Sequence, residues 1–319
     1  MSGIGARLRS DKIFAPAQSS LQSLWMLAAS FIFAFMGVCV KLASNYYSVS
    51  EIVMYRGATG LVLLGLLTRL HGGTLYTPLP WHHLRRGVIG VTALWLWFYS
   101  MSLLPLATAM TLNYMSSIWL AAMLFGINWW QGRGRFAWGL AGAILLSFGG
   151  VTLLLQPSFQ SNSLYPAMVA LGSGMLSALA YLQVRNLGLL GEPEYRVVFY
   201  FSGVGFLGGL VGQLAVSPLS WHAHTLKSGA LLLAVGLCAT AAQIAMTRAY
   251  RLGNPLISAN LQYSGIVFST IWGMLVWGDM LSWVSWTGIL IILGSGMVTT
   301  FYNYRRSEQA AKETVVADV

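Results

Sequence analysis

The feature that most constrains this chain is a series of apolar stretches, each about 20 residues long, separated by short polar connections. An α-helix rises about 1.5 Å per residue, so each stretch is long enough to cross roughly 30 Å of bilayer hydrocarbon. Of the 319 residues, 56% are hydrophobic and only 8% are charged, whereas a soluble domain is about 25% charged. The chain lacks the charge to cover a water-soluble fold, and the sequence predicts an all-α, polytopic membrane protein.

We expect ten transmembrane helices with connections too short to hold a soluble domain. Residues 1–21 and 303–319 are expected to be cytosolic tails, and the first apolar run has no convincing cleavage site, so it is interpreted as a retained span rather than a signal peptide. Several tryptophans near the proposed helix ends fit an interfacial aromatic belt. The predicted spans are residues 22–43, 51–69, 86–104, 106–126, 136–155, 164–184, 195–216, 227–249, 255–277 and 280–302.

The distribution of basic residues supports this count. If the N-terminus is cytosolic, 15 of the 18 Lys and Arg residues fall in cytosolic segments, Lys41 and Lys227 fall outside, and Arg56 lies within a span. Cytosolic connections are enriched in Lys and Arg, so the pattern predicts that both termini are cytoplasmic, and the net charge of +10 indicates topology rather than nucleic-acid binding. The cytosolic residues are Arg7, Arg9, Lys12, Arg69, Arg85, Arg86, Arg133, Arg135, Arg185, Arg196, Arg248, Arg251, Arg305, Arg306 and Lys312.

The first five spans, residues 22–155, resemble the second five, residues 164–302. An odd number of spans per repeat requires the second copy to enter the membrane from the opposite side, as in many secondary transporters. Chance alignment of glycine-rich segments is the alternative, and nearly constant offsets across three helix pairs argue against it. The matched positions are Leu112, Asn113 and Tyr114 with Leu261, Gln262 and Tyr263; Glu51 and Gly60 with Glu194 and Gly203; and Gly142 and Gly150 with Gly288 and Gly296.

These features resemble the EamA-type branch of the drug/metabolite transporter superfamily. The resemblance covers residues 22–302 and includes Arg56 within Glu51-Ile-Val-Met-Tyr-Arg56-Gly, the Ala/Pro-rich turn between spans three and four, and the closing glycines of spans five and ten. It implies a carrier of amino acids, nucleosides, vitamins, cations or drugs, often directed outward. The motifs are more specific for the fold than for the cargo.

Arg56 is the one basic residue that the predicted topology leaves inside the membrane. It follows Glu51 by five residues, about 7.5 Å along a helix, and a charge at the centre of a membrane helix costs about 2.5 to 3.5 kcal/mol on insertion scales. Its guanidinium would bind a carboxylate or phosphate at two points if it faced a cavity. Alternatively it extends outward, or is neutralised by Glu51 or a helix carbonyl.

Other candidates are cations at helix ends and polar side chains at helical spacing. Lys41 suits an anionic or zwitterionic cargo, but equally a helix C-terminus. Polar stripes along spans three, four, six, eight and nine would line a water-accessible pathway, although hydrogen bonds between helices are the alternative for each residue. The residues predicted to bind cargo or to gate the pathway are Arg56, Glu51, Lys41, Tyr55, Trp95, Tyr99, Asn113, Tyr114, Tyr181, Gln243, Gln262 and Tyr263.

Span seven is rich in glycine, with overlapping small-xxx-small patterns among Gly205, Gly208, Gly209 and Gly212. The pattern predicts close helix packing, with a hinge as the alternative.

No catalytic, metal or cofactor motif stands out in the sequence. There is no Walker A sequence and no acid in mid-membrane, Cys39 and Cys238 fit buried thiols, and the histidines of two loops, among them His83, His222 and His224, fit polar surface rather than a metal site. Glu51 is the only candidate for ion coupling through a buried carboxylate, so facilitated diffusion or exchange fits equally well.

The sequence thus predicts a non-enzymatic, cofactor-free transporter of small organic molecules in a bacterial inner membrane, surrounded by lipid and either monomeric or homodimeric. Alternating access through a cavity between the repeats is the expected mechanism. The alternatives are a membrane-embedded enzyme, a lipid-handling protein and a channel.

Overall fold

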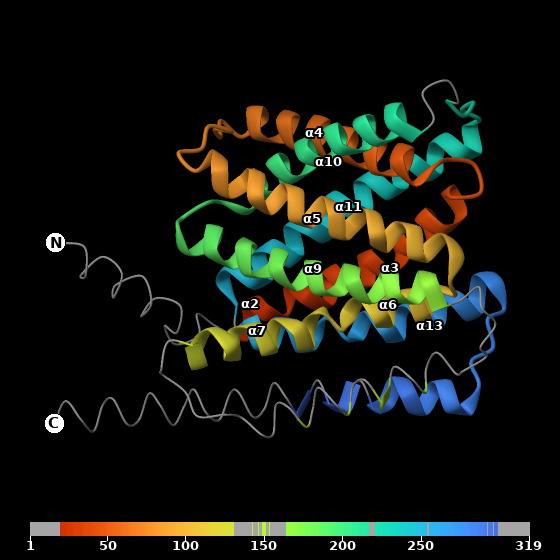
Figure 1. Ribbon diagram of the computed structural model, residues 1–319. Helices are drawn as coiled ribbons and strands as arrows, with labels where there is room; N and C mark the ends of the chain where they lie inside the picture. The colour runs from red at the N-terminus through yellow and green to blue at the C-terminus, as the bar shows by residue number, and fades with distance from the viewer. Residues whose placement is uncertain are drawn as a thin grey trace, which may run out of the picture.

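The computed structural model describes residues 20–130, 164–216, 221–253, 255–291 and 293–295, with the isolated positions 142, 146, 149, 150, 153, 297 and 298. Within these residues every regular element is a helix, and most helices lie side by side in one bundle (Figure 1). Most of the predicted span 136–155 lies outside the described residues, as do residues 1–19 and 299–319.

The helices of the first half follow the predicted spans within a few residues. A capping box starts α4, where the Glu51 backbone N–H donates to Ser48 Oγ and the Ser48 backbone N–H donates to Glu51 Oε2. Pro80 is the first residue of α5. The N–H groups in the first turn of a helix have no acceptor within the helix, so the N–H that proline lacks costs no hydrogen bond there. The helices are α2 (Ser20–Ser23), α3 (Trp25–Ala43), α4 (Val49–Leu70), α5 (Pro80–Leu103), α6 (Leu106–Tyr114) and α7 (Ser116–Trp130).

The helices of the second half follow the prediction equally closely. A second capping box, between Thr225 and Ser228, starts α11, and Gly278 ends α13 in the left-handed conformation that glycine adopts without strain. The helices are α9 (Leu164–Leu189), α10 (Glu194–Val216), α11 (Leu226–Leu252), α12 (Pro255–Leu261) and α13 (Ser264–Trp277), and residues 283–291 are also helical.

Five of the described helices, namely α3, α4, α9, α10 and α11, are long and apolar enough to cross a membrane. Their outer faces carry large apolar side chains that are open to the surroundings. Val62 on α4 is 71% exposed and Val211 on α10 is 64% exposed. Such surfaces are stable against lipid and unstable in water, so the bundle is suited to the bilayer interior.

Helices from the two halves pack against one another through the centre of the bundle. The most extensive contacts join α4 to α10, α3 to α11, and α5 to α9. The α4 and α10 helices are antiparallel and very close, because a Cβ on Gly57 would overlap the backbone of Phe206, and one on Gly209 would overlap the backbone of Met54. The close packing predicted from the glycines of span seven is therefore confirmed.

Two predicted spans are interrupted in the structure. Span four is divided at Met115 into α6 and α7, and span nine is divided at Gln262 and Tyr263 into α12 and α13. At each break the chain makes a tight i→i+3 hydrogen bond, from the Ile118 N–H to the Met115 carbonyl and from the Gly265 N–H to the Gln262 carbonyl. The first break directly follows the matched residues Leu112, Asn113 and Tyr114, and the second falls within the matched residues Leu261, Gln262 and Tyr263.

Candidate substrate pocket

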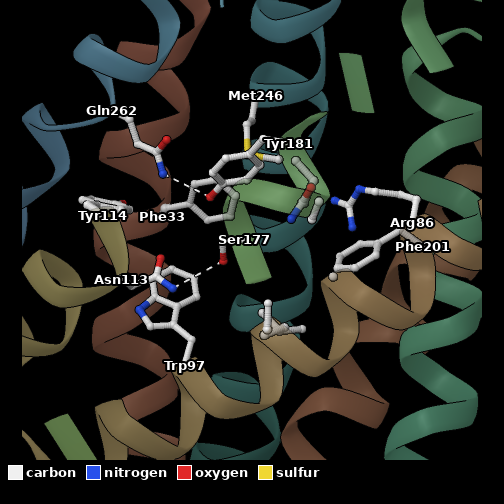
Figure 2. A pocket seen from close by; sticks show the side chains of 15 residues that line it. Phe33, Arg86, Trp97, Asn113, Tyr114, Ser177, Tyr181, Phe201, Met246 and Gln262 are labelled. Atoms are coloured by element: carbon white, nitrogen blue, oxygen red, sulfur yellow. Dashed lines mark hydrogen bonds between the residues drawn. The ribbon is translucent and has the colours of Figure 1, made fainter. Parts of the chain in front are cut away.

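A small pocket lies inside the bundle, between the helices of the first and second halves (Figure 2). Its volume is about 40 Å³, enough for one or a few water molecules but not for an organic metabolite. A larger guest requires helices to move apart. The lining residues are Phe33 of α3; Arg86, Gly90, Ala93, Leu94 and Trp97 of α5; Asn113 and Tyr114 of α6; Ser177, Ala180 and Tyr181 of α9; Phe201 of α10; Gln243 and Met246 of α11; and Gln262.

Two amide side chains of the pocket, those of Asn113 and Gln262, are held by hydrogen bonds. Asn113 donates from Nδ2 to Ser173 Oγ at 2.7 Å, which links the first half to the second. Gln262 donates from Nε2 to Tyr181 Oη at 3.1 Å and accepts from Tyr250 Oη at 3.2 Å. Because these groups are buried and mutually satisfied, they fix the shape of the wall.

Aromatic rings form much of the remaining wall. The Tyr181 and Tyr250 rings stack with centroids 5.1 Å apart, and the Trp97 ring lies 6.5 Å from that of Tyr114. The Tyr114 ring packs directly over Gly265, where any Cβ would overlap it. The walls combine ring faces with a few placed polar atoms, a composition typical of sites for small organic molecules.

Arg86 supplies the positive charge of the pocket. The expectation that it lies at the cytosolic surface is wrong, since Arg86 is 3% exposed and its guanidinium stacks 4.3 Å from the centre of the Phe201 ring. Figure 2 shows Arg86 and Phe201 on one side of the pocket and Trp97 and Tyr114 on the other. The neighbouring Arg85 is exposed. The sequence carries one signal for the buried position of Arg86: its spacing from Gly90 and Trp97 places the three residues on one face of a helix.

Arg56 lies beside the pocket rather than in its wall. It is 3% exposed, and its guanidinium carbon is 5.0 Å from the centre of the same Phe201 ring. The alternative in which Glu51 neutralises Arg56 is wrong, because the Glu51 carboxylate contacts Ser48 and His222 instead.

The predicted site residues divide into those the structure brings to the pocket and those it places elsewhere. Asn113, Tyr114, Tyr181, Gln243 and Gln262 line it. Tyr263 is buried nearby without lining it.

The other predicted residues lie farther out. Lys41 donates to the Leu104 carbonyl at 3.0 Å and sits over the Trp277 ring. Trp95 packs on Gly212 of α10. Tyr99 is 37% exposed and contacts Tyr165 on the outer surface.

A polar cluster joins the two halves near the start of α4, and we call it the His222 cluster: Tyr47, Glu51, Tyr55, His222 and His224. The His222 Nδ1 atom lies 2.7 Å from Glu51 Oε2, and its backbone N–H donates to Glu51 Oε1 at 3.1 Å. The His224 ring lies between two tyrosines, with Tyr47 Oη 2.8 Å from Nδ1 and Tyr55 Oη 2.9 Å from Nε2. His222 and His224 are exposed, as expected of polar surface residues, and they also hold the α10–α11 connection against α4.

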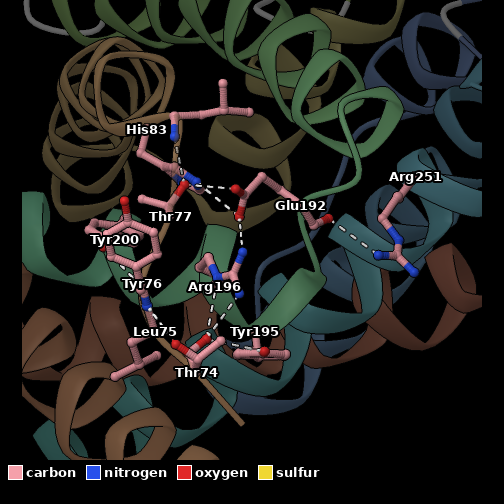
Figure 3. Close-up of polar contacts among 11 residues, drawn as sticks. Thr74, Leu75, Tyr76, Thr77, His83, Glu192, Tyr195, Arg196, Tyr200 and Arg251 are labelled. Atoms are coloured by element: carbon pink, nitrogen blue, oxygen red, sulfur yellow. Dashed lines mark hydrogen bonds and ion pairs between the residues drawn. The ribbon is translucent and has the colours of Figure 1, made fainter.

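A second cluster joins the halves near the start of α10, and we call it the Glu192 cluster: Thr77, His83, Glu192 and Arg196 (Figure 3). Glu192 accepts from Thr77 Oγ1 at 2.7 Å and from Arg196 Nη1 at 3.0 Å, and His83 Nε2 lies 3.4 Å away. Because α4 and α10 are antiparallel, the two clusters lie at opposite ends of this helix pair.

The surroundings of Glu192 determine its charge. Burial of the carboxyl opposes ionisation, but hydrogen bonds from Thr77 and Arg196, together with the Arg196 charge, outweigh it and lower the pKa of Glu192 below its ordinary value. The group is therefore ionised at neutral pH and forms a stable ion pair.

A bundle of membrane-crossing helices around a polar and aromatic pocket defines an integral membrane protein of the transporter class. The comparisons with known proteins agree. The model of the EamA-like transporter family matches residues 21–156. The chain is also 34% identical over 263 residues to the pseudopaline exporter CntI of Pseudomonas aeruginosa, covering 81% of this chain and 88% of that protein. The chain belongs to the EamA-like transporters of the drug/metabolite transporter superfamily and is an integral protein of the bacterial inner membrane.

More distant relatives carry different transporter names. The chain is 25% identical to a riboflavin transporter of Rhizobium johnstonii, over 93% of this chain and 96% of that protein. It is 21% identical to an S-adenosylmethionine uptake transporter of Rickettsia bellii, over 80% and 83%. A solved crystal structure of 18% identity matches 89% of this chain and 99% of its own chain with a TM-score of 0.66, which shows a shared fold.

Proposed function

We propose that this protein is a secondary transporter that moves small organic metabolites by alternating access through the pocket between its two halves. The observation that carries the proposal is the pocket itself, walled by helices of both halves and lined by aromatic rings and hydrogen-bonded amides. The relatives named as carriers of pseudopaline, riboflavin and S-adenosylmethionine support an amino-acid-like, vitamin-like or nucleoside-like cargo.

The pattern of helix pairs supports the two inverted repeats of this proposal. If α3, α4 and α5 correspond to α9, α10 and α11, exchanging the two sets turns the α3–α11 pair into the α9–α5 pair and returns the α4–α10 pair to itself. All three are the dominant pairs of the bundle. A pseudo-two-fold axis through the pocket produces this pattern, and rocking one half against the other would expose the pocket alternately.

The two polar clusters support the same mechanism. Each joins a residue of the first half to one of the second, and each lies at one end of the α4–α10 pair. In alternating access, one cluster separates while the other stays closed, so that the pocket opens to one side at a time.

Reconstitution tests this proposal directly. The full-length chain in proteoliposomes, loaded with a labelled metabolite library, should show saturable uptake and counterflow of selected compounds. Empty liposomes provide the baseline. Flux that rises linearly with concentration and shows no counterflow would indicate a channel, and no flux of any compound would contradict transport.

A further inference from the structure

Two buried arginines from different helices meet on one aromatic ring beside the pocket. Arg86 of α5 and Arg56 of α4 are each 3% exposed, and their guanidinium carbons lie 4.3 and 5.0 Å from the centre of the Phe201 ring. Only Arg86 lines the pocket. The absence of a side chain at Gly90 makes room for its guanidinium.

Neither arginine is neutralised by an acid within the part of the chain that the structure describes. Arg56 Nε, and Nε and Nη1 of Arg86, are buried and donate to no acceptor there. The ion pairs found among the described residues involve neither side chain. Glu51 is held by His222 and Glu192 by Arg196, so the nearest clusters offer no free carboxylate.

Uncompensated charge at depth is unfavourable, and two such charges near one another repel. An anion in the pocket would relieve both costs, and a guanidinium is suited to binding a carboxylate through two parallel hydrogen bonds. We propose that the cargo is an organic anion whose carboxylate binds Arg86, an inference that rests on the transport function proposed above.

The other pocket residues indicate the rest of this cargo. Along α5, Arg86 and Trp97 are separated by 11 residues, about 16 Å of helix. The wall between them is Gly90, Ala93 and Leu94, and the far end is aromatic. No acidic residue lines the pocket among the described residues, so a cationic ammonium group would find no countercharge. The arrangement selects a carboxylate with an apolar or ring-bearing portion over a compound whose only charge is positive.

Arg56 acts at longer range in this proposal. It lies against the same ring as Arg86, outside the wall, so its charge adds to the positive potential at the carboxylate site without contacting cargo. Replacing it should weaken anion binding less than replacing Arg86 does.

Binding to the purified full-length protein tests the charge selectivity. Melting temperatures in detergent would be measured with phenylacetate and indole-3-acetate, with their neutral amides, with phenethylamine and with phenyl phosphate. The proposal predicts stabilisation by the two carboxylates and none by the amides or the amine. Equal stabilisation by the amides, stabilisation by no carboxylate, or a stronger response to phenyl phosphate would overturn the carboxylate assignment.

Variants locate the binding group. Arg86→Gln should weaken carboxylate binding by roughly tenfold or more, Arg86→Lys should weaken it less because it keeps the charge, and Arg56→Gln should have an intermediate effect. The matched control is Arg85→Gln, which removes the same charge from an exposed position one residue away and should bind as the unmodified chain does. An unchanged response in Arg86→Gln would overturn the proposal. If that variant does not fold, Arg86→Met, which also removes the charge, takes its place, and an unchanged response there would overturn the proposal in the same way.

Transport separates this inference from the proposed function. In proteoliposomes, carboxylates should be taken up and Arg86→Gln should lose that uptake while Arg85→Gln keeps it. If the protein moves only neutral or cationic compounds, and Arg86→Gln moves them equally well, transport stands and the anionic cargo is wrong. If it moves nothing, the proposed function fails even where carboxylates raise the melting temperature.

Discussion

The His222 and Glu192 clusters join the same two halves at opposite ends of the α4–α10 pair, but they neutralise their buried carboxylates differently. Glu51 meets an imidazole at 2.7 Å, and Glu192 meets a guanidinium at 3.0 Å. A guanidinium is charged at every physiological pH, whereas an imidazole changes charge near neutrality. One end of the α4–α10 pair is therefore joined by a carboxylate–guanidinium ion pair and the other by a carboxylate–imidazole contact.

Breaking the permanent ion pair should have the largest effect. Glu192→Gln removes the negative charge that pairs with Arg196 and leaves that guanidinium without its counter-ion. We therefore expect a loss of about 3 kcal/mol of folding stability. Thermal or denaturant unfolding in detergent would measure it. Glu194→Gln is the control, because the Glu194–Arg251 pair is more exposed and should cost about 1 kcal/mol or less. Equal losses of stability in the two variants would show that the Glu192 ion pair stabilises the fold no more than the exposed pair does.

Lowering the pH should weaken the same cluster only under acidic conditions. The pKa of Glu192 is lowered in the folded protein, so its stabilising contribution is complete above the ordinary carboxyl pKa of 4.5 and is lost as the pH falls through the lowered value. Melting temperatures from pH 8 to pH 3 should show this loss in the unmodified chain. Glu192→Gln should lack that component, and an identical pH profile in both proteins would contradict it.

Removing the imidazole from the other cluster should cost less. In His222→Ala the Glu51 carboxylate loses one partner but keeps the backbone N–H of residue 222 and the Ser48 capping contact. We expect a loss of about 1 to 2 kcal/mol, measured by unfolding as above. His71→Ala, at an exposed position on α4's C-terminal end, is the control. A loss as large as that of Glu192→Gln would remove the asymmetry between the two ends.

The smallest effect should come from the edge of the His222 cluster. Tyr55→Phe deletes one hydroxyl contact with His224, whose ring still contacts Tyr47. We therefore expect a loss of about 0.5 to 1 kcal/mol of folding stability. Combining Tyr55→Phe with His224→Ala in a double-mutant cycle would measure the coupling. Additive losses would mean that the Tyr55 and His224 side chains do not stabilise each other.

Local sequence features predicted the helices well. The apolar lengths placed α3, α4, α9, α10 and α11 within a few residues, because length and hydropathy are properties of adjacent positions. The repeat predicted that Asn113 and Gln262 occupy comparable places, and both line the pocket, Asn113 two residues before one helix break and Gln262 at the other. The total of ten helices, the sidedness of the termini and contact of these residues with cargo stay predictions.

The sequence by itself determined that the chain forms membrane-crossing helices and which polar residues they carry. Only the tertiary structure decided which of those residues meet. Arg85 and Arg86 are adjacent in sequence, yet one is exposed and the other lines the pocket, because consecutive residues point about 100° apart around a helix. Glu51 pairs with His222, 171 positions away, rather than with Arg56 on its own helix. Such partners depend on the rotation and packing of whole helices, which no local pattern of residues specifies.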